Sequence, residues 1–181
     1  VIVLLLFFII TGDLNRRDFI NTTAMIGAGL FLGASTIANI ASPTADGARK
    51  KRYALVGVGG RSSMYREAVL ETYAAHSEMV GFCDLNLGRL KLAQTKARAV
   101  AGVEVPIYEA KDFDRMIRET KPDVVIVTTK DATHSQYIIR AMELGCDVMT
   151  EKPMTTDENK CSAILNPQGK TGRNCRVTFN Y

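Results

Sequence analysis

The sequence is poor in the patterns that build metal sites. It contains four cysteines, none of them in a C-x-x-C pair, and two histidines, His76 and His134, that show no ligand spacing. Structural zinc sites need clustered ligands of these types, so we expect no metal site. Cys83 and Cys146 fall in or beside expected strands, where a small buried hydrophobic residue is the default interpretation.

Basic clusters are also scarce. The formal net charge of the 181 residues is +4, and the only basic run is Lys50-Lys51-Arg52. This run precedes the first expected strand, where a solvated linker accounts for it. Nucleic-acid binding needs a basic patch or stripe, so the charge pattern gives no case for a nucleic-acid partner. No internal repeat is visible, and the length suits one domain with a good core.

The first 45 residues carry two apolar runs that set them apart from the rest. Arg16 and Arg17 precede a Gly- and Ala-rich apolar stretch (24–38), and small residues with Pro43 follow it. This order is typical of a twin-arginine export signal, with a membrane anchor or a chance arginine pair as the alternatives. The stretch is only weakly hydrophobic, which fits a signal better than a span. We therefore expect export to the periplasm, with transient membrane contact through the signal.

We divide the chain into a signal region with an upstream apolar segment (1–45), a linker (46–51) and one globular domain (52–181). The apolar run of residues 1–10 is too short to span a bilayer. It is interpreted as the tail of a longer upstream segment or as the product of a mis-set gene start.

Strand and helix patterns alternate beyond the linker. Strands are expected at 52–58, 79–84, 105–108, 124–129, 146–150 and 176–181, and helices at 62–75, 87–99, 111–120, 133–144 and 155–165. The run 124–129 is β-branched without alternation, as suits a buried parallel strand. Gly145 is placed to end a helix, and Pro167 is expected beyond the end of the last helix. Six strands with alternating helices predict an α/β fold, a doubly wound parallel sheet in the order 3-2-1-4-5-6, known as the Rossmann fold.

The segment YALVGVGGRS, from Tyr53 to Ser62, predicts a strand, a glycine turn and the start of a helix. Gly57 permits the tight turn, and Gly59 leaves room for a pyrophosphate to approach the backbone. The following helix offers free N–H groups to the phosphates. Ser62 stands where the G-x-G-x-x-G pattern has Gly or Ala for close packing of helix on strand. For the glycines alone, an ordinary βα turn is the alternative.

An acid follows the glycine turn at the end of the second expected strand. Asp84 lies about 25 residues after the turn, where a dinucleotide fold places the carboxylate that binds the adenosine ribose. Its charge would repel a 2′-phosphate. Leu85 and Asn86, rather than an arginine, follow it directly, although Arg89 lies one helical turn away. The sequence therefore predicts NAD in preference to NADP.

Two further strand ends are polar, and ligands of open α/β sheets bind at such carboxyl ends. The first is the segment 128–134, in which Thr133 is also a candidate helix cap and His134 a candidate first-turn residue. The second is Glu151-Lys152-Pro153. A lysine held there reaches a nicotinamide or a substrate hydroxyl, and the alternative is a surface salt bridge at a strand end.

Five segments together resemble the N-terminal half of the glucose–fructose oxidoreductase, inositol dehydrogenase and rhizopine-catabolism family (Gfo/Idh/MocA). These are Gly57–Arg61, Cys83–Asn86, Asp131–His134, Glu151–Pro153 and Val177–Tyr181. The similarity covers about residues 51–181. It implies that Lys152 is a catalytic residue that assists proton movement at the reacting hydroxyl.

The resemblance also implies a set of cofactor-binding residues. It places Gly57, Val58, Gly59, Gly60, Arg61 and Ser62 at the pyrophosphate, Asp84 at the ribose, Thr128, Thr129 and His134 along the crevice, Glu151 and Lys152 near the nicotinamide, and Asn180 where the last strand meets the cofactor site.

A second α/β domain completes the site in proteins of this family, and its open sheet binds a sugar or polyol. The family continues well past the Asn-Tyr pair, so we expect a fragment that lacks the C-terminal substrate domain and a further acid–base histidine. The expected function is an exported NAD(P)-dependent oxidoreductase acting on a sugar or polyol hydroxyl, a homo-oligomer when full length. The alternatives are an exported NAD-dependent glycoside hydrolase of the same superfamily and a non-catalytic nucleotide-binding fragment.

Overall fold

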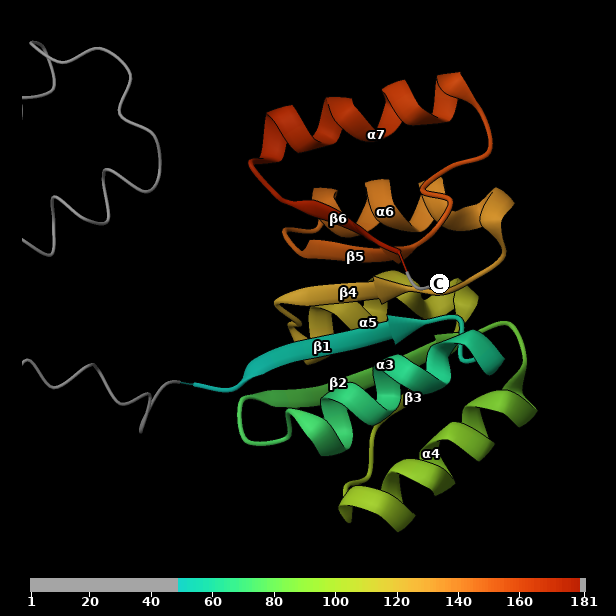
Figure 1. Ribbon diagram of the computed structural model, residues 1–181, viewed down its shortest axis with the longest axis vertical. Helices are drawn as coiled ribbons and strands as arrows, with labels where there is room; N and C mark the ends of the chain where they lie inside the picture. Colours follow the sequence, from blue (N-terminus) through green and yellow to red (C-terminus); the bar gives the residue numbers. More distant parts are fainter. Residues whose placement is uncertain (1–48, 180–181) are drawn as a thin grey trace, which may run out of the picture. The chain divides into compact units, whose positions relative to one another are not determined.

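The computed structural model describes residues 49–179 as alternating strands and helices (Figure 1). The strands are β1 (Lys51–Val56), β2 (Ser77–Asp84), β3 (Ile107–Glu109), β4 (Val124–Val127), β5 (Asp147–Glu151) and β6 (Cys175–Thr178). The helices are α3 (Ser63–Glu67), α4 (Leu87–Ala101), α5 (Phe113–Thr120), α6 (His134–Glu143) and α7 (Glu158–Thr171). Short helical turns accompany them: η1 (Gly60–Ser62), η2 (Ala68–Thr72), η3 (Ala110–Asp112) and η4 (Asp131–Thr133).

Some of the predictions fall outside this range. The proposed export signal with Arg16 and Arg17 and the predicted cofactor residue Asn180 lie outside the described residues. Within residues 49–179, no helix is long and apolar enough to cross a membrane.

The six strands form one parallel sheet in the order β3-β2-β1-β4-β5-β6, which confirms the predicted topology. The chain winds outward from β1 to β3 and then returns to β4, so the direction of winding reverses between β1 and β4. Val56 is in register with Cys83 on one side and Val127 on the other, and these strands therefore end at the same edge. In open α/β sheets, ligands bind at such a switch point, outside the carboxyl ends of the strands.

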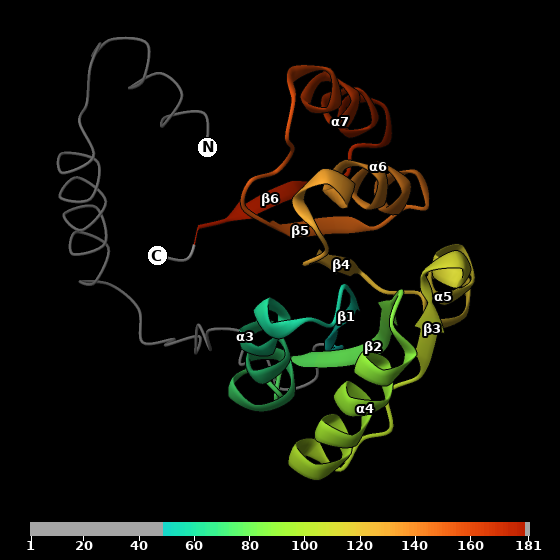
Figure 2. The ribbon, with the colours of Figure 1, turned by 90° about the vertical axis from the view of Figure 1, so that its right-hand side faces the viewer.

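The two faces of the sheet build two separate hydrophobic clusters. Leu55 and Ile126 belong to the cluster under α3 and α4, whereas Val56 and Val127 belong to the cluster under α5, α6 and α7. This alternation follows from the period of two in a strand. Figure 2 shows α3 and α4 on one side of the sheet and α5, α6 and α7 on the other. Both faces of the central strands are thus buried, which explains the continuous apolar run at β4.

The two cysteines expected in the core are buried, as predicted. Cys83 is 0% exposed and Cys146 is 2% exposed. Burial raises the pKa of the Cys83 thiol to about 12 and that of the Cys146 thiol to about 11. Both sulfurs therefore remain protonated near neutral pH and act as packing groups.

Helix α6 ends as the sequence predicts, whereas α7 does not. Gly145 has a φ of +87°. Its N–H donates to the Met142 carbonyl while the Cys146 N–H donates to the Ala141 carbonyl, which is a Schellman ending. The expectation that the last helix stops before Pro167 is wrong, because α7 continues to Thr171 with Pro167 inside it. A proline removes one backbone N–H donor, and α7 continues through Pro167 without that hydrogen bond.

Candidate functional site

The glycine turn after β1 is held by a close backbone approach. Gly57 has a φ of +91°, and a Cβ built there would lie 2.6 Å from the Thr128 carbonyl oxygen. Its N–H donates to the Cys83 carbonyl at 2.7 Å. Only glycine fits both the dihedral angle and the space, so the predicted role of Gly57 in the turn is confirmed.

The other side of the turn is open. A Cβ on Gly59 would have Arg89 Nη1 as its nearest neighbour at 3.9 Å, and a Cβ on Gly60 would meet nothing within 4 Å. Among the described residues, no backbone carbonyl oxygen accepts a hydrogen bond from the N–H of Gly59 or of Gly60. Free N–H groups beside open space are what an anionic group needs to bind.

Ser62 occupies the third glycine position of the motif without disturbing the packing. Its side chain is 0% exposed, and its hydroxyl donates to the Gly59 carbonyl at 2.6 Å. The Ser62 N–H approaches the same carbonyl at 3.2 Å. The extra oxygen relative to alanine is therefore satisfied inside the turn, which is why serine is tolerated here.

Asp84 links the end of β2 to the glycine turn. Its side chain is buried, Oδ2 accepts the Val58 N–H at 2.7 Å, and Oδ1 accepts the Asn86 N–H at 2.8 Å. Each carboxylate oxygen keeps a further lone pair, so the group remains able to accept from ribose hydroxyls. The side chain predicted to bind a ribose also fixes the turn predicted to bind the phosphates.

The loop after β4 is tied to the same turn. The buried Thr128 hydroxyl donates to the Gly57 carbonyl at 2.7 Å. The Thr133 hydroxyl donates to the Lys130 carbonyl at 2.8 Å, and α6 has no side-chain cap. Thr133 therefore stands at the N-cap position of α6, as the cap interpretation predicted, but its hydroxyl closes the preceding loop and makes no capping bond.

His134 is the first residue of α6, as one interpretation predicted, and it is only 1% exposed. Its Nδ1 lies 2.8 Å from the Pro153 carbonyl oxygen and its Nε2 lies 3.2 Å from the Thr129 carbonyl oxygen. Both ring nitrogens thus face backbone of the two loops that follow β4 and β5. Contact with a cofactor remains a prediction for this residue.

Glu151 is the centre of a buried polar network. It is 4% exposed. Its Oε1 lies 3.0 Å from Arg61 Nε and accepts from the Tyr65 hydroxyl at 2.9 Å, while its Oε2 accepts the Lys152 N–H at 3.3 Å. Burial acts to raise the pKa of this carboxyl, but hydrogen bonds from Arg61 and Tyr65 outweigh it and leave the pKa below its ordinary value.

The alternative of a surface salt bridge between Glu151 and Lys152 is wrong. The ion pair of Glu151 is with Arg61, which belongs to the glycine turn, and the carboxylate is buried. The Lys152 side chain is exposed and makes no ion pair within residues 49–179. The peptide bond between Lys152 and Pro153 is cis.

Sequence reasoning missed two members of this network, Tyr65 and Thr178. Tyr65, on α3, contacts the Thr178 hydroxyl of β6 as well as Glu151, and the Thr178 hydroxyl donates to the Thr150 carbonyl at 3.0 Å. Burial is the main cause that raises the pKa of Tyr65. The only available signal was that Tyr65 lies one helical turn after Ser62, on the face that packs on the sheet.

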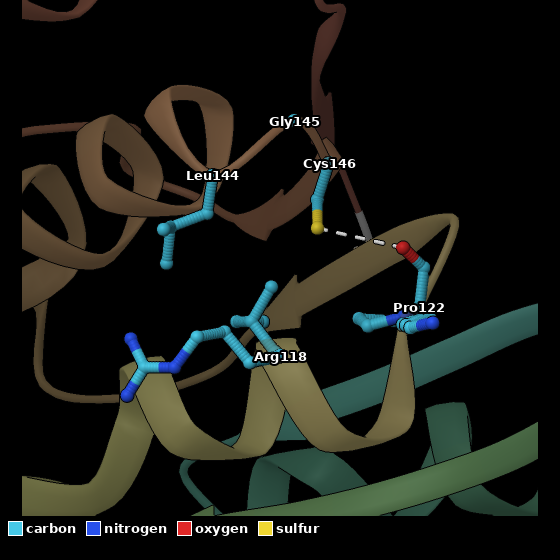
Figure 3. A pocket seen from close by; sticks show the side chains of 7 residues that line it. Arg118, Pro122, Leu144, Gly145 and Cys146 are labelled. Carbon is cyan, nitrogen blue, oxygen red and sulfur yellow. Dashed lines mark hydrogen bonds between the residues drawn. The ribbon is translucent and has the colours of Figure 1, made fainter.

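The structure therefore brings most of the predicted residues to one edge of the sheet. The glycine turn bonds to Asp84 and Thr128, and Arg61 bonds to Glu151. A hollow of about 370 Å³ lies at the opposite edge, where Figure 3 shows the Cys146 sulfur pointing at the Pro122 carbonyl 3.4 Å away. None of the predicted site residues lines this hollow, so it is separate from the candidate site.

Known proteins share this domain. A model of the oxidoreductase family with an NAD-binding Rossmann fold (GFO_IDH_MocA) matches residues 51–179. The protein YteT of Bacillus subtilis (strain 168) is 33% identical over 132 residues, which are 72% of this chain and 30% of YteT. Glycosyl hydrolase family 109 protein 1 of Akkermansia muciniphila is 31% identical over 152 residues, which are 82% of this chain and 30% of that protein.

A solved structure shows the same fold. The WlbA dehydrogenase from Chromobacterium violaceum, in complex with NADH and UDP-GlcNAcA, superposes with a TM-score of 0.63 at 32% identity. The match covers 72% of this chain and 35% of that one. The chain thus spans about 30% of the length of the two curated relatives, so their identity with it concerns one domain.

Proposed function

The chain belongs to the Gfo/Idh/MocA oxidoreductase family, whose Rossmann fold binds NAD, and from this we propose that it supplies the cofactor domain of an NAD-dependent oxidoreductase acting on a sugar or polyol hydroxyl. The substrate class rests on the relatives. WlbA was crystallised with a nucleotide sugar, and a relative from Lactiplantibacillus plantarum, 25% identical, is an inositol dehydrogenase.

The observation that carries the proposal is the pairing of the glycine turn with Asp84. The turn is open beside Gly59 and Gly60, with unused N–H groups, and the carboxylate that bonds Val58 lies next to it. A phosphate group fits the first part and a ribose diol fits the second. The residues present therefore fit a dinucleotide.

Lys152 is the residue that we propose to handle the proton. When bound, the nicotinamide supplies the hydride acceptor. The exposed Lys152 ammonium would stabilise the substrate oxygen and exchange its proton. The neighbouring Glu151 carboxylate is committed to Arg61 and Tyr65, so we assign it the role of fixing the start of this turn rather than of contacting substrate.

The preference for NAD over NADP is the first test. Asp84 is an acceptor for ribose hydroxyls and repels a 2′-phosphate, whereas Arg89 Nη1 lies near Gly59 and would attract one. We expect tighter binding of NAD than of NADP. Asp84→Asn should narrow the ratio of the two dissociation constants and Arg89→Ala should widen it, measured by calorimetry. Tighter NADP binding by the unaltered chain would contradict the proposal.

A glycoside hydrolase that uses NAD transiently is the second candidate, because 82% of the chain aligns with a family 109 protein at 31% identity. Measuring the net conversion of NAD to NADH distinguishes the dehydrogenase from the glycoside hydrolase. A dehydrogenase accumulates NADH with a sugar or polyol substrate, whereas the hydrolase returns its cofactor to NAD. Release of sugar from a glycoside without net NADH would favour the hydrolase.

We also propose export by the twin-arginine route, supported by Arg16 and Arg17 before an apolar stretch. This route accepts folded cargo, so the cofactor would be acquired in the cytoplasm. Replacing both arginines by lysine should leave the protein inside the cell. Cell fractionation measures where the double variant accumulates. Normal export of that variant would rule the twin-arginine route out.

A further inference from the structure

We propose that His134 is a positioning residue: its imidazole joins the loop after β4 to the turn after β5 and thereby sets the nicotinamide end of the cofactor site. The proposal rests on the dinucleotide function above. It assigns to His134 a role different from lining the crevice.

Both ring nitrogens of His134 lie at hydrogen-bond distance from backbone carbonyls. Nδ1 is 2.8 Å from the Pro153 oxygen, and Nε2 is 3.2 Å from the Thr129 oxygen. These carbonyls belong to segments 24 residues apart in sequence, since 153 minus 129 is 24. The ring is 1% exposed, so water does not compete for these contacts.

The two contacts are not equivalent. A neutral imidazole carries one N–H, and the proton goes to the nitrogen with the better acceptor. The Nδ1 contact is the shorter by 0.4 Å, the difference between 3.2 and 2.8 Å. We therefore assign the donated hydrogen bond to the Pro153 carbonyl and treat the contact with Thr129 as packing.

The anchored carbonyl is adjacent to the proposed catalytic lysine. Pro153 follows Lys152, whose N–H is held by the Glu151 carboxylate at 3.3 Å. The turn is thus fixed on one side of Lys152 by Glu151 and on the other by His134. Neither contact touches the Lys152 ammonium, so together they set where its backbone starts without restricting its charge.

The same ring borders the loop that follows β4. Thr129 is next to Thr128, whose hydroxyl bonds the Gly57 carbonyl at 2.7 Å. Asp84 places the adenosine end beside β2, and a dinucleotide crosses the switch point, so its other end reaches the ends of β4 and β5. His134 is a buried side chain that donates a hydrogen bond to the loop after β5 and contacts the loop after β4.

Two substitutions separate the contacts. The amide nitrogen of Asn is separated from Cα by the same number of bonds as Nδ1 of His. The amide nitrogen of Gln is separated from Cα by the same number of bonds as Nε2 of His. His134→Asn therefore keeps a donor for Pro153, whereas His134→Gln offers its donor toward Thr129. His76→Asn, at the exposed second histidine before β2, is the matched control.

The measurement is the dissociation constant of the chain for NAD and for ADP-ribose, which lacks the nicotinamide. We expect NAD to bind more tightly than ADP-ribose. His134→Gln should weaken NAD about tenfold while leaving ADP-ribose within about twofold, since a lost hydrogen bond to a buried acceptor is worth roughly that factor. His134→Asn should stay close to the unaltered chain for both ligands, as should His76→Asn.

Several results would overturn the assignment. Equal losses for NAD and ADP-ribose would show that His134 supports the fold as a whole. Unchanged NAD binding in His134→Gln, equal behaviour of the Asn and Gln variants, or equal affinity of the unaltered chain for NAD and ADP-ribose would each refute it. Failure of the chain to bind ADP-ribose at all would instead refute the proposed function, and this inference with it.

A second measurement does not depend on the variants folding. In the unaltered chain, the side-chain N–H signal of His134 in a nitrogen-15 NMR spectrum should come from Nδ1 and exchange slowly with water. It should also show a coupling to the Pro153 carbonyl carbon across the hydrogen bond. A rapidly exchanging ring proton, or a proton on Nε2 alone, would contradict the proposed link.

Discussion

Gly57 combines a φ of +91° with a backbone that touches Thr128, so a side chain there meets two penalties at once. Gly57→Ala should lower the free energy of unfolding by about 2–4 kcal/mol, because the dihedral is strained and the Thr128 carbonyl is only 2.6 Å away. Gly60→Ala is the control, since its Cβ would meet nothing within 4 Å. Urea denaturation of both variants measures the difference, and equal stability of the two would contradict it.

The carboxylate of Glu151 makes stability depend on pH. Its pKa in the folded chain lies below its ordinary value of 4.5, so the stabilisation is present above that pH and is lost as the pH falls through the folded pKa. Tyr65→Phe removes one of the hydrogen bonds that lower this pKa. The variant should be less stable by about 1–3 kcal/mol near pH 7, and the deficit should shrink in acid.

Unfolding in urea at a series of pH values, from neutral to acidic, tests this expectation. Tyr73→Phe is the control, because Tyr73 is 61% exposed and lies on the same stretch of chain. A deficit for Tyr65→Phe that stays constant with pH would mean that its hydroxyl does not act through Glu151.

Some residues of the site could be predicted from the sequence and others could not. Gly57 and Asp84 could be predicted because each obeys a local rule, a positive φ after a strand or an acid at a strand end. Tyr65 and Thr178 could not, because their hydroxyls meet only when β6 is placed beside β5. His134 was selected as a site residue, but its contacts with two carbonyls depend on loops that no local pattern describes.

Among the elements, α7 contains an interior proline, which is expected to destabilise the helix. Pro167 lies inside Glu158–Thr171 and lacks the N–H that would bond the preceding turn. Pro167→Ala should raise the free energy of unfolding by about 1–3 kcal/mol, the range set by the cost of an interior proline. Asn166→Ala, at an exposed neighbour in the same helix, controls for helix propensity. A loss of stability in Pro167→Ala would indicate that the ring packs usefully.

The error in predicting α7 has a general cause. Proline is a strong sign of a helix end, but an end also needs a residue that stops the helix, and here that residue is Gly172 with a φ of +65°. The strands were predicted more closely because their apolar runs are short and bounded by polar loops. Alternation and right-handed crossovers limit the order of the strands to a few arrangements, and the glycine turn followed by Asp84 favours the dinucleotide-binding order among them.

At the scale of the whole domain, one side of the sheet is only partly covered. Figure 2 shows α3 and α4 on that side and no described helix over β5 and β6 there. A mostly apolar hollow of about 440 Å³ lies between α3 and the sheet, with Tyr53 and Met149 in its lining. Phe179, after β6, is 69% exposed. Such a surface is suited to contact with further protein.

This arrangement leads to a prediction for residues 46–181 alone. They should unfold cooperatively and bind NAD, because the sheet, both clusters and the glycine turn lie within them. They should not oxidise sugars or polyols at a measurable rate. Lys152 is exposed, and nothing in the described residues closes over it to hold a substrate in line, so the advantage of proximity is missing.

The test is to assay this segment for NADH formation with a panel of sugars and polyols, after calorimetry has shown that it binds NAD. Bound cofactor without turnover is the expected result. Steady NADH formation that Lys152→Ala reduces would show that this segment holds a complete catalytic site, and the expectation from the family resemblance that a second domain binds the substrate would then be wrong. The same activity unaffected by Lys152→Ala would remove Lys152 from the mechanism, since loss of a proton-transfer group should slow turnover by about 10²-fold or more.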